Sequence, residues 1–208
     1  MIISHAYKYV FLRTRKTAST SIAVYLMQNL FEEGDVSIRD YRPEFDHPEP
    51  VILSDVDVHR DMKDLIENSN IDINEYKVFA VLRDPYERII SRAFYRPKGG
   101  CRNVFDARRI LAKGYVDEDD RDWPQSAYFK YNNKVCAEIW RYDQIAETLP
   151  AFVRSYGKEP IYPLHNLKSE FTPSWATPEA VITPEIKQKI DEAFAEDIEL
   201  YNSTMNSV

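Results

Sequence analysis

The sequence contains little glycine and cysteine and has no long apolar run, and each of these features excludes some classes of protein. Five glycines stand against twelve prolines in 208 residues, which indicates long, shaped loops. The two cysteines, Cys101 and Cys136, form no metal or redox spacing, so we expect free thiols in a reducing compartment, with a disulfide as the alternative. No apolar run approaches the ~20 residues that span a bilayer, and residues 1–9 lack a signal-peptide pattern. We therefore expect a soluble, cytoplasmic protein with no membrane partner.

The chain is acidic overall, but its cations are unevenly distributed. A net charge of −7 argues against a nucleic-acid partner. Residues 1–31 nevertheless contain four Lys or Arg and no Asp or Glu, and residues 77–113 contain ten against three. Two basic segments focus a positive field on an anionic ligand if the fold brings them together. The alternative is two solvated basic surfaces that never meet.

The first basic segment contains an apolar strand, a short hydroxyl-rich loop and an apolar helix within residues 7–27. A helix start after such a loop presents unpaired N–H groups and a positive dipole end to an anion. Lys16 adds a mobile cation, and hydroxyl donors come from Thr17, Ser19, Thr20 and Ser21. The loop lacks the glycines of G-x-x-x-x-G-K-[ST], which excludes the nucleoside-triphosphate P-loop. The pattern predicts a P-loop-like cradle for another anion.

Strand and helix patterns alternate along the chain. The predicted strands are residues 7–13, 51–54, 76–82 and 135–142, and the predicted helices are 20–31, 58–67, 85–95, 104–113, 125–130, 144–156 and 185–201. This order indicates an α/β fold with a mainly parallel sheet in a single domain, residues 1–208. Ligands bind at the carboxyl ends of such strands, where the segments after Arg13, Ser54 and Leu82 would meet.

A second motif, L-R-D-P-Y-E-R-I-I-S, runs from residue 82 to residue 91. Asp84 and Pro85 are typical of a helix start. Arg83 ends the strand, and Ser91 follows two helical turns later on roughly the same face. The guanidinium of Arg83 can bind a phosphate with two hydrogen bonds, and Ser91 can donate a third. The alternative is a set of surface salt bridges with a packed serine.

Together the two motifs resemble the sulfotransferases that use 3′-phosphoadenosine 5′-phosphosulfate (PAPS). The loop R-K-T-A-S-T-S resembles their 5′-phosphosulfate loop, and R-D-P-Y-E-R-I-I-S resembles their 3′-phosphate motif. The likeness is closest to carbohydrate 2-O-sulfotransferases of the heparan and uronyl type, whose loop also reads K-T-A-S-T-S. The resemblance implies a P-loop-like three-layer fold, with a central mainly parallel sheet flanked by helices. It also implies a PAPS donor, no metal, and a hydroxyl acceptor that we expect to be a saccharide.

The resemblance also assigns site residues. Lys16 would contact the sulfonate and the bridging oxygen, and the loop that wraps the 5′-phosphosulfate would comprise Arg15, Lys16, Thr17, Ala18, Ser19, Thr20 and Ser21. The 3′-phosphate would be held by Arg83 and Ser91, with added contacts from Lys168 and Ser169. Candidates on the acceptor side are Asp57, Trp123 and Gln125. A cation aimed at the leaving oxygen stabilises the transition state more than the ground state.

An alcohol acceptor also needs a general base. Related 2-O-sulfotransferases carry an H-x-H pair whose second histidine is the base, and D-V-H here keeps His59 but replaces the first histidine with Asp57. Asp57 would then orient the imidazole, as a carboxylate does in a triad. The alternatives are Asp55 or Asp57 as a carboxylate base, or a purely structural segment.

Two other classes of protein compete with this interpretation. A kinase-like P-loop phosphotransferase would need a glycine-bearing loop and an acidic magnesium ligand at a strand end, where this chain has Arg83. A non-catalytic anion-binding protein on the same fold would have no need of Lys16 and His59.

Overall fold

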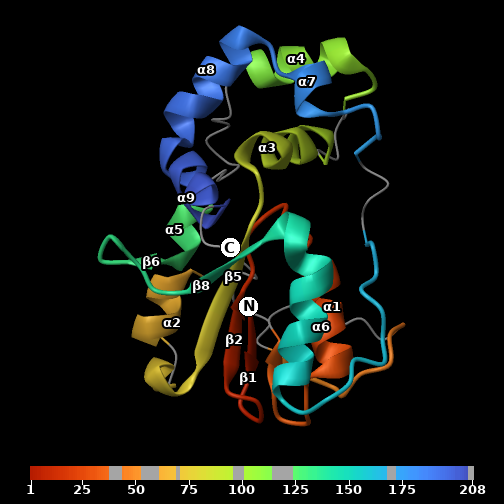
Figure 1. Cartoon of the computed structure of the whole chain (residues 1–208), viewed down its shortest axis with the longest axis vertical. Coiled ribbons are helices and arrows are strands. Elements are labelled where there is room, and N and C mark those ends of the chain that lie inside the picture. The colour runs from red at the N-terminus through yellow and green to blue at the C-terminus, as the bar shows by residue number, and fades with distance from the viewer. Residues whose placement is uncertain are drawn as a thin grey trace. The chain divides into compact units, whose positions relative to one another are not determined.

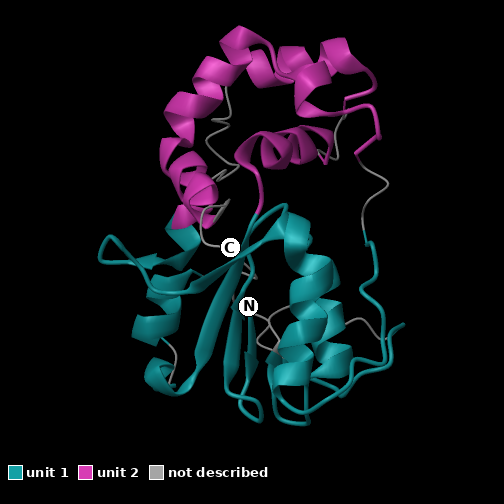
Figure 2. Cartoon of the chain, in the orientation of Figure 1, with its two compact units in different colours: residues 1–82, 127–167 teal, residues 83–126, 168–208 magenta. Residues whose placement is uncertain are grey.

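The structure is a computed structural model that describes residues 1–37, 44–52, 61–68, 71–95, 101–113, 124–167 and 172–205. The chain divides into two compact units (Figure 2). The first comprises residues 1–82 and 127–167 and contains a sheet, and the second comprises residues 83–126 and 168–208 and is helical where described. No helix in these ranges is both long and apolar enough to cross a membrane.

The sheet of the first unit has the strand order β4-β3-β1-β2-β5-β8. Its strands are β1 (Ile2–Ser4), β2 (Tyr9–Leu12), β3 (Val36–Ser37), β4 (Val51–Ile52), β5 (Lys77–Leu82) and β8 (Glu138–Arg141). β2 is parallel to β5, β5 to β8, and β3 to β4, whereas β1 is antiparallel to both of its neighbours. All strands except β1 therefore point the same way, which confirms the predicted α/β class and mainly parallel sheet.

One face of the sheet packs against α1 (Ser19–Asn29) and α6 (Ile145–Ser155) (Figure 1). Phe79 of β5 is central to this core, where it stacks on Phe11 at 5.2 Å and on Trp140 at 3.9 Å between ring centroids. The edge of Phe152 from α6 meets the same ring at 5.0 Å. Aromatic pairs of this geometry add to the free energy gained by burying apolar surface.

Side chains of β5 that point to the opposite face, including Ala80 and Leu82, are also buried. Figure 1 shows α2 (Met62–Asn68) on the side of the sheet away from α1 and α6. Strands covered on both faces read as continuous apolar runs, which explains why residues 76–82 gave the clearest strand pattern. The first unit also contains η1 (Ile73–Glu75), β6 (Lys130–Tyr131), β7 (Lys134–Val135) and η2 (Tyr142–Gln144). The short helix α5 (Ser126–Phe129) spans the point in sequence where the units change.

The second unit contains α3 (Pro85–Phe94), α4 (Val104–Ala112), α7 (Pro178–Val181), α8 (Pro184–Ala193) and α9 (Ala195–Met205). Their apolar faces share one core that includes Ile89, Leu111, Val181 and Ile190. Thr183 caps α8 by accepting a hydrogen bond from the N–H of Ile186, as expected of a Thr-Pro helix start.

The prediction of one terminal helix over residues 185–201 is wrong, because the chain leaves the helical conformation at Phe194 (φ −127°, ψ 28°). The ring of Phe194 is buried and lies 5.1 Å from the guanidinium carbon of Arg88. The break between α8 and α9 therefore accompanies the burial of this ring beside a buried charge.

Candidate phosphate-binding site

The loop between β2 and α1 adopts a conformation that usually requires glycine. Lys16 has φ 64° and Ala18 has φ 54°, both in the left-handed region. This region costs an L-residue with a side chain ~1–2 kcal/mol, because its Cβ approaches the following carbonyl oxygen. The sequence lacks the glycines of a P-loop, but two residues of the loop still adopt the left-handed conformation, and strain of this kind is common at ligand sites.

Two buried threonine hydroxyls hold the loop together. The single O–H of Thr17 faces two acceptors on Thr14, its Oγ1 at 2.8 Å and its carbonyl at 3.0 Å. Thr14 donates to the carbonyl of Val81 on β5 at 2.8 Å. The hydroxyl of Thr17 is therefore buried among these partners.

The first turn of α1 is well suited to an anion. Ala18 is the N-cap and its side chain makes no cap hydrogen bond, and the first bond inside the helix runs from Ile22 N–H to the Ala18 carbonyl at 3.0 Å. The amides of Ser19, Thr20 and Ser21 thus precede the first intrahelical donor. The first turn has no acidic residue to neutralise the positive end of the helix dipole.

Arginine and lysine side chains add positive charge around this turn. Arg13 is only 3% exposed, and its Nη2 donates to the hydroxyl of Thr20 at 3.4 Å. Arg15 and Lys16 are partly exposed. Sequence reasoning missed Arg13 and Thr14 as site residues, because a residue at a strand end gives no sign of which way its side chain will turn.

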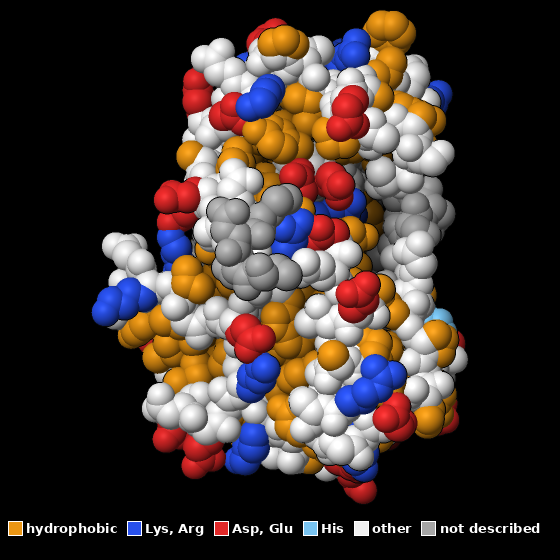
Figure 3. All heavy atoms as spheres, viewed as in Figure 1, with side chains coloured by type: hydrophobic (Ala, Val, Ile, Leu, Met, Phe, Trp, Pro, Cys, Tyr) orange, Lys and Arg blue, Asp and Glu red, His pale blue; other side chains and the backbone are white. Residues whose placement is uncertain are grey.

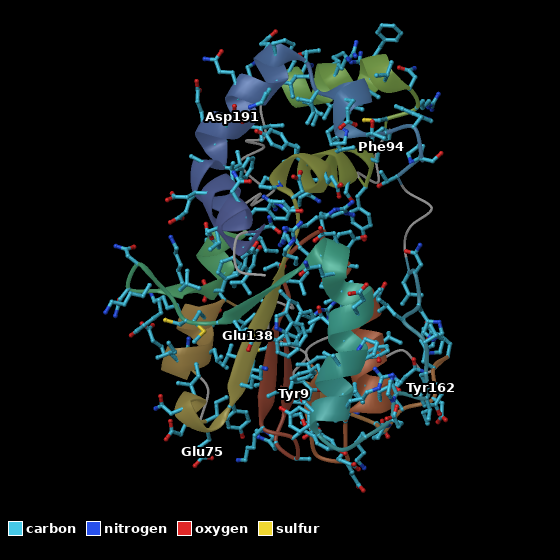
Figure 4. The ribbon with its side chains drawn as sticks, viewed as in Figure 1. Tyr9, Glu75, Phe94, Glu138, Tyr162 and Asp191 are labelled. Carbon is cyan, nitrogen blue, oxygen red and sulfur yellow. The ribbon has the colours of Figure 1, made fainter. Side chains whose placement is uncertain are left out.

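A later segment of the first unit lies along α1 (Figure 1). The N–H of Leu167 donates to the hydroxyl oxygen of Ser21 at 3.1 Å. At the other end of α1, the side-chain oxygen of Asn29 accepts from the N–H groups of Ile161 and Tyr162 at 2.9 and 3.0 Å. Tyr162 is labelled in Figure 4 on this segment. Residues 161–167 therefore run toward the helix start and are anchored at both ends.

The second predicted motif begins the second unit and forms the start of α3. Asp84 caps the helix by accepting from the amides of Tyr86 and Glu87 at 2.9 and 3.0 Å, as its sequence predicts. The Nε of Arg83 donates to Glu87 at 3.2 Å. Ser91 follows Glu87 by one more helical turn and is buried, so these side chains follow one side of α3.

Gln125, an acceptor-side candidate from the sequence, has a carboxamide that bonds to the main chain of Arg83. The residue is fully buried. Its Oε1 accepts from the N–H of Arg83 at 2.9 Å, and its Nε2 donates to the carbonyl of Arg83 at 2.8 Å. The remaining predicted positions, Asp57, His59, Trp123, Lys168 and Ser169, lie outside the described residues.

The strand ends in the first unit share one edge of the sheet. β2, β4, β5 and β8 point the same way, so the segments that follow them all leave from their carboxyl edge. β8 ends there with Arg141, a buried arginine that sequence reasoning did not single out. Its Nε donates to Asp143 at 2.8 Å, and hydrogen bonds from Arg141 lower the pKa of the Asp143 carboxyl below its usual value.

Figure 3 shows cationic and anionic side chains interspersed over the visible face. The described residues therefore form no broad basic surface on that face. Both cysteines are free thiols. Within the described ranges, no group of His, Cys, Asp or Glu side chains is placed to hold a metal ion.

A strand, a loop with left-handed residues and a helix start without a side-chain cap, with Arg13 bonded to its first turn, are features suited to an oxyanion. A sequence model of the sulfotransferase family matches residues 1–127, which is more than half of the 208 residues and includes both motifs. The chain belongs to the sulfotransferase family and is thereby an enzyme of sulfate transfer. Comparisons with curated proteins and with solved structures gave no match.

Proposed function

We propose that the protein transfers a sulfonyl group from PAPS to a hydroxyl acceptor, with a saccharide as the expected acceptor. The observation that supports this most is the loop between β2 and α1, where Lys16 and the uncapped first turn of α1 form an anion cradle in a member of the sulfotransferase family. The resemblance to 2-O-sulfotransferases supports the saccharide. We also propose the P-loop-like three-layer fold and a single sulfotransferase domain, residues 1–208.

The residues of the loop fit a 5′-phosphosulfate. The amides of residues 17–21 would hold the 5′-phosphate oxygens, together with the hydroxyl of Ser21, because that hydroxyl accepts from Leu167 and keeps its own O–H to donate. Lys16 would lie against the bridging oxygen and the sulfonate. As the S–O bond to the phosphate breaks, the cation would stabilise the charge that collects on the leaving oxygen.

Arg83 and Ser91 would hold the 3′-phosphate, with Lys168 and Ser169 as added contacts. Arg83 supports this role because its guanidinium is only partly exposed and already has a fixed partner in Glu87. A guanidinium held in place loses less freedom when it binds a phosphate with two hydrogen bonds.

His59 would accept the proton of the attacking hydroxyl, with Asp57 orienting its ring. Chain length supports this placement. β4 lies three strands from β2 in the sheet, a separation of about 14 Å. Residues 52 to 59 can extend over about 23 Å, which is enough to reach the loop from the same edge. Trp123 and Gln125 are the other candidates on the acceptor side.

Binding and turnover can be tested separately. Calorimetric titration with 3′-phosphoadenosine 5′-phosphate, the desulfated product, should show binding to the intact chain. Incubation with sulfur-labelled PAPS and a panel of saccharides, phenols and simple alcohols should then label at least one acceptor. Absence of product binding would overturn the PAPS assignment. Binding without transfer to any acceptor would instead favour a non-catalytic anion-binding protein.

A further inference from the structure

We propose that Gln125 is a positioning residue for the 3′-phosphate site. Its side chain fixes the main chain of Arg83 so that the guanidinium of Arg83 meets that phosphate. This inference rests on the proposed function, in which Arg83 binds the 3′-phosphate. It assigns Gln125 a role that differs from the acceptor-side contact suggested by its sequence context.

The carboxamide of Gln125 contacts both main-chain polar groups of one residue. Its oxygen accepts from the N–H of Arg83 at 2.9 Å, and its nitrogen donates to the carbonyl of Arg83 at 2.8 Å. The two bonds cross 42 positions of sequence. Because one planar group accepts one bond and donates the other, the two bonds restrain the backbone of Arg83 as a neighbouring strand would, just after β5 ends at Leu82.

Gln125 is itself held by a buried carboxylate. Asp197 of α9 accepts from the N–H of Gln125 at 2.7 Å and from the N–H of Ser126 at 2.8 Å. Asp197 is fully buried, and the Nη2 of Arg88 lies 4.0 Å from it, which offsets its charge. A chain of hydrogen bonds thus runs from α9 through Gln125 to Arg83, all within the second unit.

Burial of the Gln125 carboxamide costs desolvation free energy that an apolar side chain at the same position would not cost. A buried carboxamide is unfavourable unless all of its polar groups are satisfied, and an apolar side chain of the same size could fill the volume. The two bonds to Arg83 give the carboxamide oxygen and nitrogen of Gln125 one partner each and hold the main chain of Arg83, while Glu87 holds its guanidinium at 3.2 Å. Arg83 is therefore restrained at both ends, as preorganised binding requires.

The test compares two ligands that differ only in the 3′-phosphate, 3′-phosphoadenosine 5′-phosphate and adenosine 5′-monophosphate. Gln125→Met keeps the volume and removes both bonds to Arg83. We expect it to weaken binding of the first ligand roughly tenfold, because a lost restraint of about 1.4 kcal/mol corresponds to that factor. Binding of the second ligand should stay unchanged. Gln188→Met is the matched control, because Gln188 is exposed and donates to Glu192 within α8 at 3.0 Å.

A second variant, Gln125→Glu, tests the geometry of the two bonds. A protonated carboxyl group accepts and donates like the amide, whereas a carboxylate cannot donate to the carbonyl of Arg83. Preference for the 3′-phosphate, relative to wild type at the same pH, should recover in Gln125→Glu as pH falls and should not recover in Gln125→Met. If Gln125→Met does not fold, Gln125→Glu provides the same ligand comparison.

The possible outcomes separate the two proposals. Equal weakening of both ligands in the Gln125 variants, or no weakening of either, would overturn the positioning role while the proposed function stands. A wild-type protein that binds the two ligands equally well would overturn the proposed 3′-phosphate site and the role of Gln125 with it.

Discussion

The main-chain N–H of Leu167 donates to the hydroxyl oxygen of Ser21 at 3.1 Å, across 146 positions of sequence. The bond joins the first turn of α1 to the end of the segment that Asn29 anchors at the other end of the helix. Lys168, a proposed contact of the 3′-phosphate, is the next residue in the chain. One serine thus combines an anchor for this segment with a proposed contact to the 5′-phosphate.

Ser21→Ala should affect both ligand binding and stability. The variant loses the acceptor for the Leu167 amide and the O–H proposed for the phosphate, so we expect a loss of ~1 kcal/mol in the free energy of unfolding. Binding of 3′-phosphoadenosine 5′-phosphate should weaken about tenfold. Urea titration and calorimetry measure the two effects.

Asn29→Ala is the matched control, because it releases the same segment at the far end of α1. It should lower stability at least as much as Ser21→Ala and weaken the nucleotide less. If the two variants weaken binding equally, Ser21 acts only as an anchor.

Lys16→Ala should remove most of the transfer rate. Loss of a group that stabilises developing charge costs ~10²–10³ in rate, and the first-order rate of sulfonyl transfer at saturating donor measures it. Lys8→Ala is the control, because Lys8 is also a cation with positive φ in the acid-free segment but pairs with Glu75 on the surface. If the rate of Lys16→Ala stays within about threefold of wild type, the loss is too small for a group that stabilises the leaving oxygen, and this role of Lys16 is wrong.

Ala18→Gly should stabilise the protein slightly, the reverse of the usual effect at a helix. Relief of the left-handed conformation is worth ~1–2 kcal/mol, while the added freedom of glycine in the unfolded chain costs roughly 0.5–1 kcal/mol. We expect a net gain of about 0.5 kcal/mol in the free energy of unfolding by urea titration. Ala151→Gly, on the exposed side of α6, should instead lose about 1 kcal/mol. A loss at Ala18 equal to that at Ala151 would mean that the residue is not strained.

The sequence predicted those helices and strands whose own residues specify them, through a continuous apolar run or a helix cap. The strand at residues 76–82 was evident because its side chains are buried on both faces, and α3 because Asp84 and Pro85 start it. The sequence did not indicate β1 and β3, which are three and two residues long. β1 is held in the sheet by antiparallel pairing with β2, and β3 by antiparallel pairing with β1. Strands this short carry too few residues to show a periodic pattern.

In the candidate site, contacts between residues far apart in the sequence could not be predicted. The residue types of the loop indicated an anion cradle, but Thr14 bonds to Val81 and Gln125 bonds to Arg83 through tertiary contacts alone. The left-handed conformation of Lys16 and Ala18 also runs against their residue types, because local preference favours other conformations. Sites with such conflicts between local preference and fold are often functional.

His59→Ala should lower the transfer rate about 10²–10⁴-fold, as expected for loss of a general base. The limb of the pH–rate profile in which activity rises with pH should disappear, because the imidazole that must lose its proton to act as the base is then missing. Asp57→Asn should retain the limb but lower the rate, if Asp57 orients the ring. His5→Ala is the control, since His5 is exposed and contacts Tyr76 at 2.8 Å. An unchanged profile in His59→Ala would leave Asp55 or Asp57 as the base.

The pKa of Tyr7 provides a prediction for alkaline pH. Burial of the phenol, a hydrogen bond to Glu32 at 2.6 Å and the charges of Glu32 and Asp35 raise the pKa of Tyr7 from 10.0 to about 12. The folded state therefore holds this proton more tightly than the unfolded chain. The stabilisation is fully present below pH 10.0 and is lost as pH rises through the folded pKa of about 12.

Tyr7→Phe keeps the ring and its edge contact with Tyr156 at 5.7 Å but cannot titrate. Urea titrations at about pH 9 and about pH 11 should therefore show wild type losing more stability than Tyr7→Phe between the two values. Glu32→Gln, which removes the charge but keeps an acceptor, should lower the pKa of Tyr7 and reduce the difference, because the charge of Glu32 is one of the causes of the shift. Parallel losses of stability in wild type and Tyr7→Phe would show that Tyr7 titrates alike in the folded and unfolded states.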